Sequence, residues 1–259
     1  MAEKFREKAA VLEQEQIAAG IYSMWLQTEQ IAPAARPGQF ISVYSNDGSR
    51  MLPRPISLCE IDREKKAVRI VYRVAGKGTE EFSRCAVGDT LEILGPLGNG
   101  FPLERCPEGK RAFLIGGGIG IPPMVQLASE LKGEAQVVVG YRDELFLTEE
   151  LAAHGTLYLA TEDGSAGTKG NVIDCIREHA LTADVIFACG PTPMLRALKT
   201  YAAEQGIECW ISMEERMACG IGACLACVCK SKEVDEHSRV HNKRICKEGP
   251  VFLADDVEL

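Results

Sequence analysis

The sequence has 259 residues and a formal net charge of −8, and 46% of its residues are hydrophobic. This length suits two ordinary domains with a small third module. The acidic balance argues against nucleic acid as a main partner, because phosphate contacts need basic surface. No apolar run approaches the roughly 20 residues of a membrane span. The charged start lacks the apolar stretch of a secretory signal, so we expect a cytoplasmic protein without a membrane partner.

The first hundred residues contain short β-prone runs that end at turn residues. Residues 39–44, 67–74 and 89–94 form three such runs, and glycine, proline or asparagine residues follow each of them. Short strands punctuated in this way are typical of an antiparallel barrel or sandwich. We therefore predict an antiparallel β-domain at the start of the chain.

Three short segments of this β-region are candidates for holding a flavin dinucleotide. An arginine can pair with a diphosphate through two hydrogen bonds, and a serine can bond a ring edge. Tyr72 could stack on a ring, although a tyrosine in a sheet more often packs against its neighbours. Each segment alone is a weak signal. The candidate residues are Arg54, Pro55, Ile56, Ser57, Val71, Tyr72, Arg73, Gly78 and Thr79.

The pattern changes near residue 110. Compact apolar runs at residues 111–115, 136–140, 156–161 and 184–189 alternate with helix-like stretches. Such alternation predicts right-handed βαβ units and a parallel sheet. Residues 207–212 have the composition of its last strand.

A glycine-rich loop follows the first of these strands. Glycines let a phosphate approach the backbone, and the helix N-terminus that follows favours negative charge. The loop departs from G-x-G-x-x-G, and a tight turn without a ligand is the alternative. A second turn at a strand end, Cys189-Gly190-Pro191, could likewise bind a ligand or be a plain turn. The same two interpretations hold for residues 161–164. The candidate loop glycines are Gly116, Gly117, Gly118 and Gly120.

Five of the eleven cysteines fall within residues 219–246. Cys219, Cys224 and Cys227 have the spacing C-x4-C-x2-C, and Cys246 follows later. This is the plant-type spacing for a 2Fe-2S cluster, in which three thiolates on one loop hold one side and a distant fourth closes the other. In a reducing compartment such a group favours a metal site over disulfides.

A structural zinc site is the alternative for the same cysteines, since four thiolates also suit tetrahedral zinc. Zinc loops usually pair two C-x2–4-C knuckles, and the second knuckle is missing here. Cys229 lies two residues beyond Cys227 and would point the opposite way in an extended chain, so we interpret it as a non-ligand. Residues 213–259 are too few to fold easily without a metal.

Taken together, these motifs resemble the ferredoxin–NADP reductase superfamily, and within it the electron transfer subunits of NAD-dependent dihydroorotate dehydrogenase of the B type. The stretches that carry this resemblance cover residues 54–57, 116–123, 213–227 and 246–252. The cysteine-rich stretch is the most specific of them. Ile56 replaces the aromatic residue that the superfamily usually has there, so ring stacking from that position is lost.

The resemblance implies an α+β multidomain chain with three parts. These are an FAD-binding antiparallel β-barrel over residues 1–103, an NAD-binding α/β domain with a parallel sheet over residues 104–212, and a 2Fe-2S module over residues 213–259. The nine candidate residues of the β-region would contact FAD, and the two glycine-containing turns would contact NAD, which is a substrate. The cluster ligands would be Cys219, Cys224, Cys227 and Cys246.

The resemblance also implies a partner, an FMN-containing catalytic subunit that oxidises dihydroorotate in pyrimidine biosynthesis, in a heterotetramer with two copies of each subunit. Electrons would pass from that FMN through the cluster and FAD to NAD⁺. No catalytic acid or base is required on this chain, because hydride transfer needs chiefly positioning. Arg142 and Asp143 leave the choice between NAD and NADP open.

Two other functions remain possible from the residues. One is an electron-transfer subunit of another NAD(P)H-dependent ferredoxin or sulfide oxidoreductase, which would use the same cofactors. The other is a zinc-stabilised binding protein on a reductase scaffold.

Overall fold

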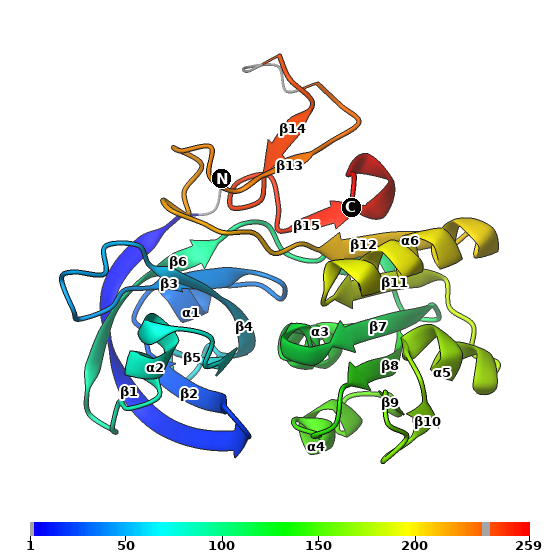
Figure 1. The fold of residues 1–259 in the computed structure, drawn as a ribbon, viewed down its shortest axis with the longest axis horizontal. Helices are drawn as coiled ribbons and strands as arrows, with labels where there is room; N and C mark the ends of the chain where they lie inside the picture. The colour runs from blue at the N-terminus through cyan, green and yellow to red at the C-terminus, as the bar shows by residue number, and fades with distance from the viewer. Residues whose placement is uncertain (1–2, 235–238) are drawn as a thin grey trace.

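A computed structural model describes residues 3–234 and 239–259 of the chain. A β-barrel and an α/β unit lie side by side, and the C-terminal segment crosses above both of them (Figure 1). Within the described residues, none of the helices combines the length and apolar character needed to traverse a bilayer.

The first part is a closed barrel with strand order β1-β2-β5-β4-β3-β6. Every neighbouring pair is antiparallel, which confirms the barrel and excludes the sandwich. Alternate side chains such as Ile41, Ile70 and Ile93 fill its interior. The strands are β1 (Phe5–Ala18), β2 (Ile21–Gln27), β3 (Phe40–Val43), β4 (Arg54–Asp62), β5 (Ala67–Arg73) and β6 (Thr90–Leu97), with short helices α1 (Ile31–Ala34) and α2 (Lys77–Phe82).

The second part is a seven-stranded sheet with order β10-β9-β8-β7-β11-β12-β15. Its first six strands run parallel, as predicted. The strands are β7 (Arg111–Gly117), β8 (Glu134–Tyr141), β9 (Thr156–Thr161), β10 (Thr168–Lys169), β11 (Val185–Cys189), β12 (Glu208–Ser212) and β15 (Val251–Leu253).

Helices cover both faces of this sheet. α3 (Pro123–Glu130) and α4 (Thr148–Ala152) pack on the face toward the barrel, and α5 (Val172–Glu178) and α6 (Thr192–Gln205) pack on the other face (Figure 1). Because strand residues alternate, Leu114 faces one helical layer and its neighbour Phe113 faces the other.

The barrel and the α/β part share one buried core. Cys59 and Val71 of the barrel pack in the same cluster as Met124 of α3. At this boundary the buried Gln126 side chain accepts the Ile61 N–H at 2.6 Å. The core and the hydrogen bond hold α3 against β4.

Residues 207–212 contain the last parallel strand, β12, as predicted, but β12 is not the edge of the sheet. β15 lies beyond β12 and pairs with it antiparallel, with Ile211 opposite Phe252. The C-terminal segment therefore leaves the sheet after β12, forms the hairpin β13 (Val228–Lys230) and β14 (Asn242–Arg244), and returns to the sheet edge. The division at residues 103 and 212 stays a prediction.

Asn99, just after β6, connects the barrel to the returning segment. Its side-chain amide donates to the carbonyls of Glu248 (3.1 Å) and Val251 (2.7 Å), and its Oδ1 accepts the Val251 N–H at 3.0 Å. Its backbone N–H donates to the Gly249 carbonyl at 2.7 Å. One side chain thus pairs with three backbone groups, one just before β15 and two on its first residue.

Replacing Asn99 by alanine removes all three side-chain bonds and leaves half-buried backbone groups unpaired. We expect Asn99→Ala to lower the free energy of unfolding by about 1–3 kcal/mol, measured by urea denaturation of the intact protein. Asn46→Ala is the matched control, because the exposed Asn46 amide makes one bond, to the Thr90 carbonyl. An Asn99→Ala protein as stable as Asn46→Ala would contradict this role.

Candidate functional site

The two glycine-containing turns lie next to each other at the carboxyl ends of β7 and β11. These strands are neighbours in register, with Gly116 opposite Cys189. From β7 the chain adds β8, β9 and β10 on one side of the sheet, and then β11 and β12 on the other. The turns therefore flank the point where strand order reverses, which is where open α/β sheets bind ligands.

The glycines permit a close approach between these turns. A Cβ on Gly120 would lie 2.5 Å from the Cys189 carbonyl carbon and 2.6 Å from the Gly190 nitrogen. A Cβ on Gly117 would lie 2.6 Å from Met194 Sδ of α6. A short 3-10 turn, Gly118–Gly120, links β7 to α3, whose first residue is Pro123. Pro123 suits the first helical turn, where a backbone N–H has no partner within the helix.

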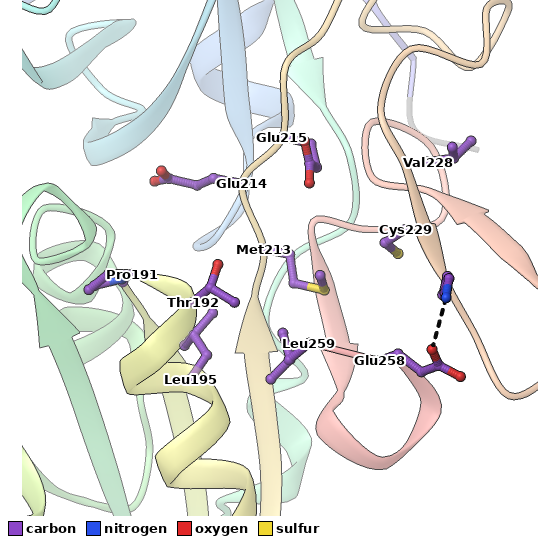
Figure 2. A pocket seen from close by; sticks show the side chains of 12 residues that line it. Pro191, Thr192, Leu195, Met213, Glu214, Glu215, Val228, Cys229, Glu258 and Leu259 are labelled. Atoms are coloured by element: carbon purple, nitrogen blue, oxygen red, sulfur yellow. Dashed lines mark ion pairs between the residues drawn. The ribbon is translucent and has the colours of Figure 1, made fainter.

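A cavity of about 500 Å³ opens beside the second turn (Figure 2). Glu214 and Glu215 follow β12 and point to opposite sides of the chain there. Surrounding protein atoms partly desolvate the Glu214 carboxyl and raise its pKa, although the residue as a whole is exposed. The lining residues are Gly190, Pro191, Thr192, Leu195, Met213, Glu214, Glu215, Val228, Cys229, Lys230, Glu258 and Leu259.

Sequence reasoning missed Glu214 as a residue of this site. The Glu214 carboxylate is close enough to Cys189 to raise the pKa of that thiol, after the larger effect of burial. The sequence contained a signal for Glu214, because this residue lies just beyond the carboxyl end of β12, the strand next to β11. Open α/β sheets bind ligands at the carboxyl ends of their strands, and this rule, which selected Cys189, applies equally to β12.

Two of the three candidate flavin segments meet, at Arg54 of β4 and Gly78 of α2. A Cβ on Gly78 would lie 2.7 Å from Arg54 Nε, so the guanidinium lies directly on the glycine. The Thr79 hydroxyl accepts the N–H groups of Ala75 (2.9 Å) and Gly76 (3.2 Å) and so fixes the turn before α2. A cation beside a bare backbone suits a diphosphate, which fits the predicted dinucleotide.

Tyr72 packs inside the barrel wall. Its ring stacks on Tyr22 with centroids 6.1 Å apart and meets Phe82 edge-on at 6.2 Å. Its hydroxyl accepts from Gln14 Nε2 at 3.1 Å, and the residue is 3% exposed. The ring is thus committed to neighbouring side chains. Of the other candidates, Val71 and Ile56 are buried, Pro55 and Ser57 are half-buried, and Arg73 is exposed.

The four candidate ligand cysteines are arranged as two pairs. Cys219 and Cys224 have their sulfurs 3.3 Å apart, and the Cys227 thiol hydrogen-bonds Cys246. Cys219 also lies close enough to raise the pKa of the Cys246 thiol, so the two pairs are neighbours. Two thiolates for each of two irons is the arrangement a 2Fe-2S cluster needs. Among the described residues, no three His, Cys, Asp or Glu side chains form a group that could hold a metal ion.

Backbone N–H groups of the cysteine loop point at a sulfur. Burial tends to raise the pKa of Cys219, but N–H groups of Cys224, Ile221 and Ala223 lower it to about 6. Burial and the Cys227 thiol raise the pKa of Cys246 to about 12. Donors aimed at a sulfur stabilise a thiolate, which is the form that binds iron.

Cys229 has other contacts. Its thiol meets the Lys243 carbonyl at 3.5 Å across the β13–β14 hairpin, and it lines the cavity of Figure 2. Its interpretation as a non-ligand stays a prediction.

The cysteine loop packs on the outside of the barrel. Gly220 has φ +68°, and a Cβ there would lie 3.0 Å from Ser42 Oγ and 3.2 Å from Leu97 Cδ1. Ser42 pairs with Pro55 across β3 and β4. The loop therefore lies one strand away from the Arg54–Ser57 run.

Known proteins resemble the chain over nearly all of its length. Residues 214–258 match the family described as the iron-sulfur cluster binding domain of dihydroorotate dehydrogenase B. The "Dihydroorotate dehydrogenase B (NAD(+)), electron transfer subunit" of Bacillus caldolyticus is 44% identical over 98% of this chain and 99% of its own. The protein of the same name from Listeria monocytogenes is 43% identical over 96% and 97%.

Solved structures agree with these relatives. An NADH-dependent reduced ferredoxin–NADP oxidoreductase superposes with a TM-score of 0.86 at 28% identity, over 96% of this chain and 89% of its own. A flavohemoglobin from Malassezia yamatoensis shares the fold, with a TM-score of 0.65 at 22% identity over 78% of this chain and 57% of its own. The chain belongs to the family of electron transfer subunits of NAD-dependent dihydroorotate dehydrogenase B.

Proposed function

We propose that this chain passes electrons between NAD and the FMN of a dihydroorotate-oxidising catalytic subunit, using one FAD and one 2Fe-2S cluster. The observation that supports this most strongly is the packing of the cysteine loop on β3, beside the Arg54–Ser57 run of β4. The candidate cluster site and the candidate flavin site then lie on adjacent strands of the barrel.

When bound, FAD exchanges a hydride with nicotinamide and single electrons with the cluster, which carries one electron at a time. The task of the protein is to hold these groups in line. Arg54, resting on Gly78, would bind the FAD diphosphate. The loop of Gly116–Gly120 and the start of α3 would bind the NAD diphosphate, with Cys189 and Glu214 beside the nicotinamide. Cys219, Cys224, Cys227 and Cys246 would bind the irons.

The partner would be an FMN-containing catalytic subunit, in a heterotetramer with two copies of each chain. The base that acts on dihydroorotate would belong to that subunit. Ile221 (44% exposed) and Leu225 (63%) stand out from the cysteine loop, and apolar side chains on such a loop suit a protein interface. The cytoplasmic location stays a prediction.

A second candidate function has support from one structural relative. The ferredoxin–NADP oxidoreductase likeness at 28% identity fits an electron-transfer subunit that serves a different partner. The cofactors would be the same, so only the partner separates the two functions.

The proposed function is tested by coexpressing this chain with an FMN-containing dihydroorotate dehydrogenase subunit. We expect the purified complex to form NADH from dihydroorotate and NAD⁺, whereas the catalytic subunit alone should reduce only artificial acceptors. A complex that shows NADH-dependent dye reduction but no coupling to dihydroorotate would favour the second candidate. A colourless chain that contains zinc would exclude both.

Replacing a ligand cysteine should lower the iron content of the protein, whereas replacing a non-ligand cysteine should not. We expect Cys246→Ser to lose most of its iron and its 2Fe-2S absorbance, because only three thiolates remain. Cys229→Ser is the matched control, a buried cysteine on the same segment, and should keep both. Loss of iron in Cys229→Ser with retention in Cys246→Ser would reverse the assignment of the fourth ligand.

The close approach of the two turns should control nicotinamide binding. In Gly120→Ala the new methyl group meets the Cys189 carbonyl, so the turns must separate. We expect NADH affinity to fall about tenfold, in line with overpacking costs of about 1–3 kcal/mol, with FAD and iron content unchanged. Gly48→Ala, where nothing lies within 4 Å, should bind NADH normally. Equal affinities for the two variants would contradict this site.

A further inference from the structure

Ser42, in the middle of β3, carries a hydroxyl with no partner. The residue is 1% exposed, and its Oγ makes no hydrogen bond to any described part of the chain. An unpaired buried hydroxyl is destabilising, because it gives up its hydrogen bonds to water and gains none in return. A small apolar residue at this position would avoid that penalty. The hydroxyl therefore indicates a hydrogen-bond partner that the described chain does not supply.

The direction of the Ser42 side chain follows from its strand. Ile41 and Val43 point into the barrel interior, so Phe40 and Ser42 point outward. Phe40 packs in the same buried cluster as Cys227 and Cys246. The outward face of β3 is therefore the face that the cysteine segment covers.

The cysteine loop lies directly over the hydroxyl. Ser42 Oγ lies 3.0 Å from where a Cβ of Gly220 would be, and Gly220 directly follows Cys219. Across the sheet, Ser42 is opposite Pro55 and Leu94, whose side chains offer no acceptor. The third neighbour, Leu97, is also apolar.

We propose that the Ser42 hydroxyl donates a hydrogen bond to a sulfur atom of the iron–sulfur cluster held by this loop. The inference rests on the proposed function, because it requires the cluster. Ser42 is then a positioning residue that tunes the cluster. A donor to a cluster sulfur stabilises the more negative, reduced form, so the hydroxyl raises the reduction potential.

Two other roles for Ser42 make different predictions. The hydroxyl could instead bond the flavin, because Ser42 is opposite Pro55 of the candidate flavin run. It could also serve only to fill space beneath Gly220. Measuring the cluster and the flavin separately distinguishes these roles.

The test uses the complete protein with its cofactors and partner. Midpoint potentials of the cluster and the flavin are measured by titration followed by EPR and visible absorbance. Exchangeable protons near the reduced cluster are detected by pulsed EPR in H2O and D2O. In Ser42→Ala we expect a lower cluster potential, the loss of one exchangeable-proton coupling, and an unchanged flavin potential.

Paired variants control for volume. Ser42→Thr and Ser42→Val add the same bulk, but only threonine keeps the hydroxyl, so the cluster potential should be higher in Ser42→Thr than in Ser42→Val. Ser23→Ala removes another buried serine, on β2, and should shift neither potential.

Three outcomes would overturn the inference. They are equal cluster potentials in Ser42→Thr and Ser42→Val, an unchanged proton coupling in Ser42→Ala, or a shift confined to the flavin. A wild-type protein without any 2Fe-2S signal would instead remove the proposed function itself.

Discussion

The C-terminal segment packs directly on the end of the barrel, and the placement of the candidate redox sites depends on that contact. Gly220 rests on Ser42 and Leu97, and Asn99 binds the chain on both sides of Pro250. β15 then ties the segment to the second sheet. Because the segment is attached to both parts, the cysteine loop is held over β3 rather than left as an independent module.

The position of the candidate nicotinamide site, at the ends of β7 and β11, is set by the topology of the parallel sheet. Strand order reverses between β7 and β11, so the two loops that follow these strands diverge and leave a crevice. Glycines at 117, 120 and 190 let the loops approach each other closely at its base. The barrel packs against α3, on the same face of the sheet as α4.

The parts of the fold with a strong periodic signal could be predicted from the sequence. The apolar runs of β7, β8 and β11 form largely buried strands, the run of β9 forms a partly buried one, and the barrel strands β3 and β5 end at clear turns. β1 escaped prediction because much of it is exposed, so its pattern lacks apolar alternation. β15 has three residues, too few for any pattern, and its partner β12 is distant in the sequence. The cysteine spacing indicated the four candidate ligands, but the pairing of these cysteines and the loop's contact with Ser42 depend on tertiary packing.

The central claim is that four sulfurs in two neighbouring pairs hold two irons beside the barrel. X-ray absorption at the iron and zinc edges of the purified protein tests it most directly. The account predicts iron bound by four sulfurs with a second iron as a close neighbour. Zinc bound by four sulfurs, or iron with no neighbouring iron, would contradict it.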